Sequence, residues 1–114
     1  MIEIFLYELL FITNRMIIAE ITILPVGTKT ASLSKYVADA IKELKAMNLN
    51  PKVTAMGTIF EAKDITTILE GFKRVHEAVF RNAVPRVVSI LKIDERRDKE
   101  GSIKQKLNSL KKYE

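Results

Sequence analysis

The spacing of apolar residues switches repeatedly along this chain, and the order of the switches restricts its fold more than any other feature. Residues 17–26 are rich in β-branched side chains and are bounded by Pro25 and Gly27, which is typical of a strand. In residues 33–47 apolar side chains recur every three or four positions, the spacing of one buried helical face. The chain therefore begins its folded part as a strand followed by a helix.

Two short strands, a second helix and a last strand complete the pattern. Residues 51–62 are consistent with two strands broken at residues 56–58, where a glycine indicates a tight turn. Asp64 is the expected N-cap of a helix whose apolar face runs over residues 65–79, and residues 86–94 form the last strand. The order predicts an α+β fold, the ferredoxin-like βαββαβ sandwich. Its antiparallel sheet should have the order 4-1-3-2, with two helices on one face.

Capping residues place the ends of the expected helices. Thr30 or Ser32 is the predicted N-cap of the first helix. That helix should end near residues 48–50, because Pro51 disfavours a helical residue before it. Ser102 should open a short C-terminal helix, whose apolar residues are Ile103, Leu107 and Leu110.

One face of the expected sheet carries no helix and is unusually apolar. Such a face is seldom left bare in a monomer, so we expect a partner subunit or the C-terminal helix to cover it. The carboxylate of Glu20 in this face must be solvated, paired or bound to a ligand. An ion pair with Lys92 and contact with a ligand are equally consistent with the pattern. The face comprises Ile18, Glu20, Thr22, Leu24, Val88, Ile90, Lys92 and Asp94.

The residues that usually carry catalysis or bind metals are scarce. There is no cysteine and one histidine, which excludes disulfides, thiolate metal sites and multi-histidine sites within one chain. His76 lies four residues from both Phe72 and Phe80, a spacing that favours a packed core histidine, and no partner can be assigned to it. We therefore predict no catalytic residue, no metal site and no cofactor.

The net charge of +5 would suit an anionic partner, but basic and acidic residues are interleaved. A ferredoxin-like sheet that binds RNA displays stacking aromatics on its central strands. Here only Phe60 could serve, so we expect no nucleic-acid partner.

Residues 1–15 differ in character from the rest of the chain. They are apolar but interrupted by Glu3 and Glu8, and shorter than the roughly 20 residues that span a bilayer. They also lack the features of a secretory signal, so we expect no membrane association and a cytoplasmic location. We interpret them as an extension from an upstream start, with the domain at residues 16–114. The alternative is an amphipathic segment that covers apolar surface.

Five separated segments resemble one known family. They are AEITILPVGT (19–28), SLSKYVADAI (32–41), MGTIFE (56–61), HEAVF (76–80) and IDERRD (93–98). Together they resemble the thiamine-binding protein family of small ferredoxin-like proteins (YkoF-like), over residue 16 to about residue 110. The resemblance implies a homo-oligomer, a dimer or a dimer of dimers. It also implies binding of thiamine, or of its hydroxymethylpyrimidine part, without catalysis.

A candidate ligand site follows from this resemblance. A carboxylate and a hydroxyl can recognise the donor and acceptor groups of an aminopyrimidine, and a carboxylate or an aromatic ring favours the thiazolium cation. The alternative function is a structural or regulatory oligomer whose loops bind only incidental anions. The candidate ligand-binding residues are Glu20, Thr22, Ser34, Met56, Gly57, Thr58, Phe60 and Asp94.

Overall fold

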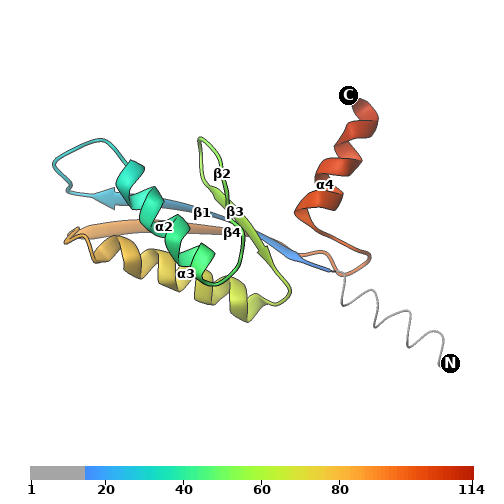
Figure 1. The fold of residues 1–114 in the computed structure, drawn as a ribbon, viewed down its shortest axis with the longest axis horizontal. Coiled ribbons are helices and arrows are strands. Elements are labelled where there is room, and N and C mark those ends of the chain that lie inside the picture. The colour runs from blue at the N-terminus through green and yellow to red at the C-terminus, as the bar shows by residue number, and fades with distance from the viewer. Residues whose placement is uncertain (1–14) are drawn as a thin grey trace.

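The computed structural model describes residues 15–114, so the expected extension lies outside the described residues apart from Arg15. Two helices cover one face of a four-stranded sheet, and a third helix stands at one end (Figure 1). The elements are β1 (Ile17–Val26), α2 (Ser34–Ala46), β2 (Lys52–Val53), β3 (Thr58–Ala62), α3 (Ile65–Phe80), β4 (Arg86–Asp94) and α4 (Ile103–Leu110), followed by a 3₁₀ turn at Lys111–Tyr113.

The sheet order is β2-β3-β1-β4, which confirms the predicted order read from the opposite edge. All neighbouring strands are antiparallel. β4 pairs with β1 from Ile18 to Val26, whereas β3 pairs with it only from Ile17 to Ile21. The two edges of β1 are therefore covered to different extents.

The core lies between the sheet and α2 and α3. Ile17, Ala19 and Ile21 of β1 face the helices and are buried, as their alternation predicts. Phe60 of β3 is completely buried among them, as is Leu44 of α2. This packing fixes which face of each strand remains available for contacts outside the sandwich.

Two of the predicted helix caps are confirmed and one is wrong. Asp64 Oδ1 accepts a hydrogen bond from the Thr67 N–H at 2.7 Å, and Ser102 Oγ accepts one from Gln105 at 3.0 Å. α2 begins after Leu33, which makes no side-chain cap. The predicted cap Thr30 instead uses its hydroxyl within the preceding loop, where it accepts from the N–H of Ser32 at 3.1 Å.

The turn between β2 and β3 lies slightly earlier than predicted. Thr54 Oγ1 accepts hydrogen bonds from the N–H groups of Met56 at 3.2 Å and Gly57 at 3.1 Å, which folds residues 54–57 into the hairpin tip. Thr58 already belongs to β3 and pairs with Ile21. The hydroxyl of Thr54, rather than the glycine alone, fixes the position of the turn.

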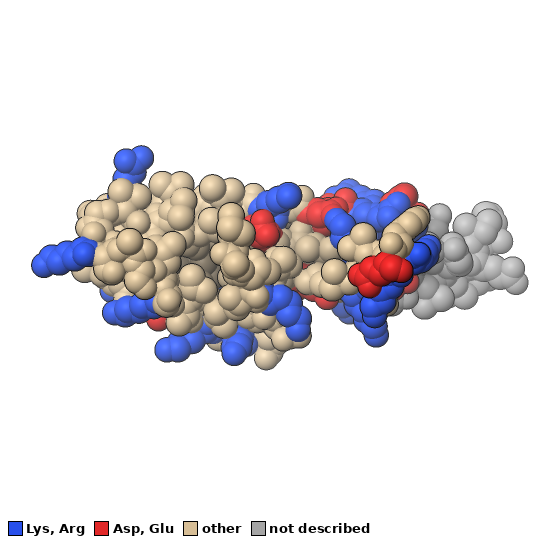
Figure 2. Space-filling model, turned by 90° about the horizontal axis from the view of Figure 1, so that it is seen from above, with Lys and Arg blue, Asp and Glu red and all other residues tan. Residues whose placement is uncertain are grey.

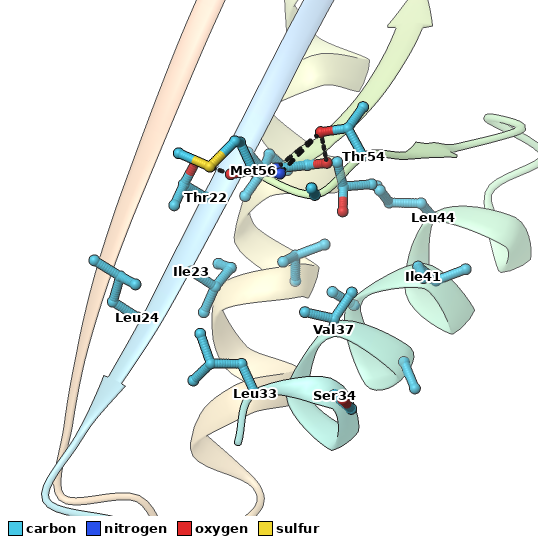
Figure 3. Close-up of a pocket in the computed structure, with 17 residues that line it drawn as sticks. Thr22, Ile23, Leu24, Leu33, Ser34, Val37, Ile41, Leu44, Thr54 and Met56 are labelled. Carbon is cyan, nitrogen blue, oxygen red and sulfur yellow. Dashed lines mark hydrogen bonds between the residues drawn. The ribbon is translucent and has the colours of Figure 1, made fainter. Parts of the chain in front are cut away.

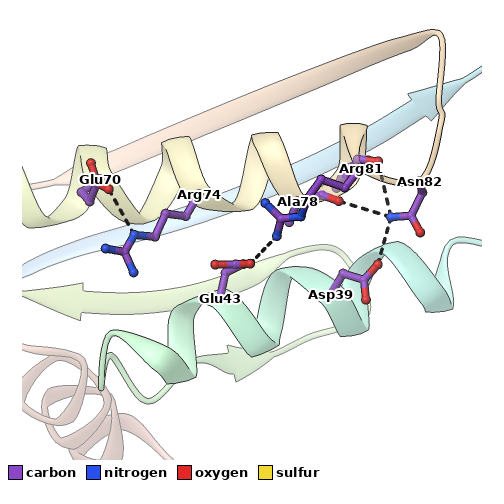
Figure 4. A network of polar contacts seen from close by, with 8 residues as sticks. Asp39, Glu43, Glu70, Arg74, Ala78, Arg81 and Asn82 are labelled. Atoms are coloured by element: carbon purple, nitrogen blue, oxygen red, sulfur yellow. Dashed lines mark hydrogen bonds and ion pairs between the residues drawn. The ribbon is translucent and has the colours of Figure 1, made fainter.

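Polar contacts join α2 to the end of α3 (Figure 4). Asn82 Nδ2 donates to Asp39 Oδ2 at 2.9 Å and to the carbonyl of Ala78 at 3.2 Å. Arg81 pairs with Glu43 of α2. These contacts join the middle of α2 to the C-terminal end of α3.

α4 is attached to the end of the sheet by polar contacts. Glu61 Oε2 accepts a hydrogen bond from the N–H of Ile103 at 2.8 Å, and Lys106 Nζ lies 2.5 Å from Asp94 Oδ2. α4 extends beyond the strands rather than across them (Figure 1). Much of the helix-free face, including Val88 and Ile90, therefore remains exposed in the described part of the chain.

Candidate functional site

A pocket opens where β3 ends before β1 does. β1 is ten residues long and β3 is five. Beyond the end of β3, one edge of β1 faces the start of α2 and the hairpin tip across a cavity of about 700 Å³. Residues 21–24 of β1, one face of α2 and residues 54–58 form its walls (Figure 3).

The pocket is apolar on its helix side and carries hydroxyl groups around it. Leu33, Val37 and Ile41 form the helix side, and Thr22 and Ser34 contribute hydroxyls (Figure 3). Among residues 15–114, no charged side chain lines this cavity. Such a lining suits a flat, uncharged ring with a few polar atoms at its edge.

Gly57 brings the hairpin tip into close contact with β1. A Cβ atom at this position would lie 3.2 Å from Glu20 Cγ, 3.2 Å from the Ile21 carbonyl oxygen and 3.3 Å from Thr22 Oγ1. The Thr22 hydroxyl also donates a long hydrogen bond of 3.5 Å to the carbonyl of Met56. Glycine is therefore needed here because the two backbones approach closely, and the side chain of Glu20 lies against a residue that lines the pocket.

The structure brings most of the predicted ligand-binding residues together, but not all of them. Five of them line the pocket: Thr22, Ser34, Met56, Gly57 and Thr58. Glu20 adjoins Gly57 from the helix-free face. Phe60 lies in the core with no exposed surface, and Asp94 lies beside α4. The assignment of these residues to a ligand remains a prediction.

Glu20 and Asp94 share a second, smaller cavity of about 250 Å³ between the helix-free face and α4. Glu20 lies opposite Lys92 in the β1–β4 register, yet its carboxylate forms no ion pair or hydrogen bond with any described residue. Lys106 donates a hydrogen bond to Asp94 and, with its positive charge, lowers the pKa of that carboxyl. The described contacts therefore give Asp94 a partner and leave Glu20 without one.

Charged side chains gather at the end of the molecule that carries α4. Viewed from above, the surface over the sandwich is mostly uncharged, with a few lysines and arginines at its margin (Figure 2). Acidic and basic side chains crowd together at the other end, near α4 (Figure 2). The 700 Å³ pocket therefore has an uncharged lining, whereas the cavity shared by Glu20 and Asp94 is lined by charged side chains.

His76 has a partner that the sequence did not reveal. Its Nδ1 atom lies 2.6 Å from Ser89 Oγ of β4 in a half-buried hydrogen bond. Its ring also packs edge-on against Phe80, with a centroid distance of 5.1 Å. In the described residues no carboxylate hydrogen-bonds to this pair, so it joins α3 to β4 without the third group of a catalytic triad. The alternation of side chains along β4 turns Ser89 toward the helices, and this pattern in the sequence could have identified Ser89 as the partner of His76.

Two further observations concern the part of the chain that the structure describes. Nowhere in it do three acidic, histidine or cysteine side chains converge as a metal ion would require. None of its helices has the length and apolar character needed to cross a bilayer.

Comparison with known proteins gives one consistent family. The family model described as "Thiamine-binding protein" matches residues 19–111. A UPF0045 protein of Methanothermobacter thermautotrophicus is 44% identical over 96 residues, covering 84% of this chain and 97% of the relative. A UPF0045 protein of Methanocaldococcus jannaschii is 49% identical over 96 residues, covering 84% of this chain and 93% of the relative.

Solved structures show the same fold. The crystal structure of a Methanocaldococcus jannaschii protein superposes with a TM-score of 0.77 at 48% identity, covering 85% of this chain and 97% of that one. A candidate thiamine biosynthesis/salvage protein of Thermotoga maritima superposes with a TM-score of 0.69 at 19% identity, covering 87% of this chain and 99% of that one. At that identity the second likeness shows the fold alone.

Proposed function

The chain belongs to the thiamine-binding protein family, and from this premise we propose that it binds thiamine, or its hydroxymethylpyrimidine part, without catalysing a reaction. The observation that carries the proposal is the uncharged cavity of about 700 Å³ beside an acidic residue that has no described partner. The cavity would hold the pyrimidine ring, and Glu20 would lie near the charged part of the ligand.

The pyrimidine ring matches the lining of the pocket. Its two faces are apolar, and one of them would pack against Leu33, Val37 and Ile41 on the helix side. Its edge carries an amino group and ring nitrogens, which need hydrogen-bond partners once water is excluded. The hydroxyls of Thr22 and Ser34 are suitable partners because each can donate or accept.

The thiazolium ring of thiamine carries a positive charge, and Glu20 supplies a carboxylate near the pocket. Glu20 Cγ lies 3.2 Å from the position of a Cβ at Gly57, and Gly57 lines the cavity. A cation placed there would be attracted to Glu20, which forms no ion pair with a described residue. Hydroxymethylpyrimidine lacks this ring, so its affinity should depend less on Glu20 than that of thiamine.

The proposal includes self-association in the cytoplasm. Apolar side chains remain exposed on the helix-free face, where Ile90 is 53% exposed, and on α4, where Leu107 is 56% exposed. A second copy of the chain could cover both surfaces at once. Light scattering coupled to gel filtration should give the mass of a dimer or a tetramer. A monomer at micromolar concentration would contradict this part of the proposal.

Binding can be tested by thermal shift and titration calorimetry. Thiamine and hydroxymethylpyrimidine should raise the melting temperature, whereas sulfate should not. The substitution Glu20→Gln should weaken thiamine binding at least about fivefold, since opposite unit charges about 4 Å apart attract by roughly 1 kcal/mol in water and roughly 4 kcal/mol near a protein surface. Glu70→Gln, which alters an exposed pair within α3, is the matched control and should leave the affinity unchanged.

The same screen distinguishes the alternative function. Stabilisation by sulfate without any response to thiamine would favour a structural or regulatory oligomer that binds incidental anions. Unchanged thiamine affinity in Glu20→Gln would remove Glu20 from the site while leaving the ligand in place.

A further inference from the structure

The edge of β1 that faces the pocket has no strand beside it. β4 pairs with β1 as far as Val26, but on the other edge β3 pairs only as far as Ile21. From residue 23 onward the backbone groups on that edge have no strand partner within residues 15–114. This edge is also a wall of the 700 Å³ cavity, because residues 21–24 line it.

The direction of the backbone groups follows from Gly57. The Ile21 carbonyl oxygen lies 3.2 Å from the position of a Cβ at Gly57, so it points toward the hairpin rather than toward β4. Backbone groups of successive strand residues point to opposite edges. The N–H and C=O of Ile23 therefore point toward the pocket, whereas those of Leu24 point to β4.

Pro25 supports this assignment independently. A proline inside a strand is tolerated where its missing N–H would face away from the ladder. Pro25 lies opposite Val87 within the β1–β4 pairing, so its nitrogen must face the open edge. Pro25 and Ile23 are two residues apart and share that edge. Outside the β1–β4 ladder, no hydrogen bond within residues 15–114 uses the N–H or C=O of Ile23.

We propose that the backbone of Ile23 recognises the edge of the pyrimidine ring, an inference that rests on the proposed function. The Ile23 carbonyl accepts a hydrogen bond from the exocyclic amino group, and the Ile23 N–H donates one to the adjacent ring nitrogen. The ligand thus occupies the position opposite Ile23 that β3 would fill if it began earlier in the chain. Leu33, Val37 and Ile41 then contact the face of the ring that is turned toward α2.

This arrangement makes the protein selective for an amino group. A pyrimidine with a carbonyl oxygen in place of the amino group presents an acceptor to the Ile23 carbonyl and a ring N–H to the Ile23 N–H. Both bonds would be lost, and like groups would face each other. Pro25 reinforces the preference, because its missing N–H leaves a single donor, that of Ile23, among the backbone groups of residues 23 and 25.

Amide hydrogen exchange followed by NMR tests the inference on the intact protein. Without ligand, the Ile23 amide should exchange faster than the Leu24 amide, which is paired in the β1–β4 ladder. Saturating hydroxymethylpyrimidine should slow exchange at Ile23 at least tenfold and change Leu24 little. The analogue with a carbonyl in place of the amino group should bind at least tenfold more weakly by calorimetry.

The outcomes separate this inference from the proposed function. If hydroxymethylpyrimidine binds but exchange at Ile23 is unchanged, or the carbonyl analogue binds equally well, the backbone of Ile23 is not the recognition element and the proposed function stands. If neither thiamine nor hydroxymethylpyrimidine binds, both the proposed function and this inference are overturned. Slow exchange at Ile23 before ligand is added would show that its edge is already occupied, which also refutes the inference.

Discussion

The substitution Gly57→Ala tests the close approach between the hairpin tip and β1. The new Cβ would lie 3.2 Å from the Ile21 carbonyl oxygen and 3.2 Å from Glu20 Cγ, tighter than ordinary van der Waals contact. Glu20 can rotate away, but the carbonyl of Ile21 belongs to a central strand. The hairpin tip must therefore shift by a few tenths of an ångström away from β1.

The cost follows from two opposing effects. Overpacking of this kind costs about 1–3 kcal/mol, and the flexible Glu20 side chain places Gly57→Ala in the lower half of that range. Replacing glycine by alanine also lowers the conformational entropy of the unfolded chain, which raises the free energy of unfolding by about 0.4–1 kcal/mol. The free energy of unfolding should fall by a net value of about 1 kcal/mol.

Gly101→Ala provides the matched control. The nearest atom to a Cβ at Gly101 is 3.7 Å away, an ordinary contact, and its φ is not positive. The free energy of unfolding of this variant should rise by about 0.4–1 kcal/mol. The melting temperatures of the two variants should therefore differ by about 6–12 °C for a domain of this size. Scanning calorimetry measures the difference. Equal stabilisation by both substitutions would refute the close approach at Gly57.

Three further predictions concern stability and pH. Ala83 has a φ of 58°, so Ala83→Gly should raise the free energy of unfolding by about 0.5–1 kcal/mol in urea denaturation, and a loss would show that this backbone is not strained. Gly27 has a φ of +84° and its Cβ would lie 2.8 Å from Pro85 Cγ, so Gly27→Ala should lower the melting temperature, and an unchanged value would contradict both observations. Lys106 lowers the pKa of Asp94, so their contact contributes fully above the ordinary pKa of about 3.9 and is lost as the pH falls through the lowered value. The protection factors of the α4 amides, which correct for the slower intrinsic exchange in acid, should then fall, and Asp94→Asn should abolish that dependence.

Much of the fold could be predicted because each element is encoded locally. Apolar periodicity identified both core helices, and a single side chain caps α3 and another caps α4, at Asp64 and Ser102. The start of α2 could not be predicted in the same way. Thr30 has the chemistry of a cap, but its hydroxyl serves the loop before the helix, and only the folded loop shows which use prevails.

The candidate site was harder to predict because it depends on how strands align. Glu20, Thr22 and Gly57 were expected to lie together, and they do. Phe60 was expected near the ligand, yet the alternation of β3 turns it with Thr58 and Ala62 toward the helices, where all three are buried. That orientation could have been read from the strand pattern once its register with β1 was known. The partner of His76 required the same register information for β4.

The difference in length between β1 and β3 has a consequence for how such a chain can diverge. The open edge from Ile23 to Val26 spans about 13 Å at roughly 3.3 Å per residue. A hairpin lengthened by two residues on each arm would extend β3 along that edge and fill the pocket with the chain's own backbone, without altering the wall residues of β1 and α2. Insertions at this one turn would therefore reduce the volume of the pocket stepwise.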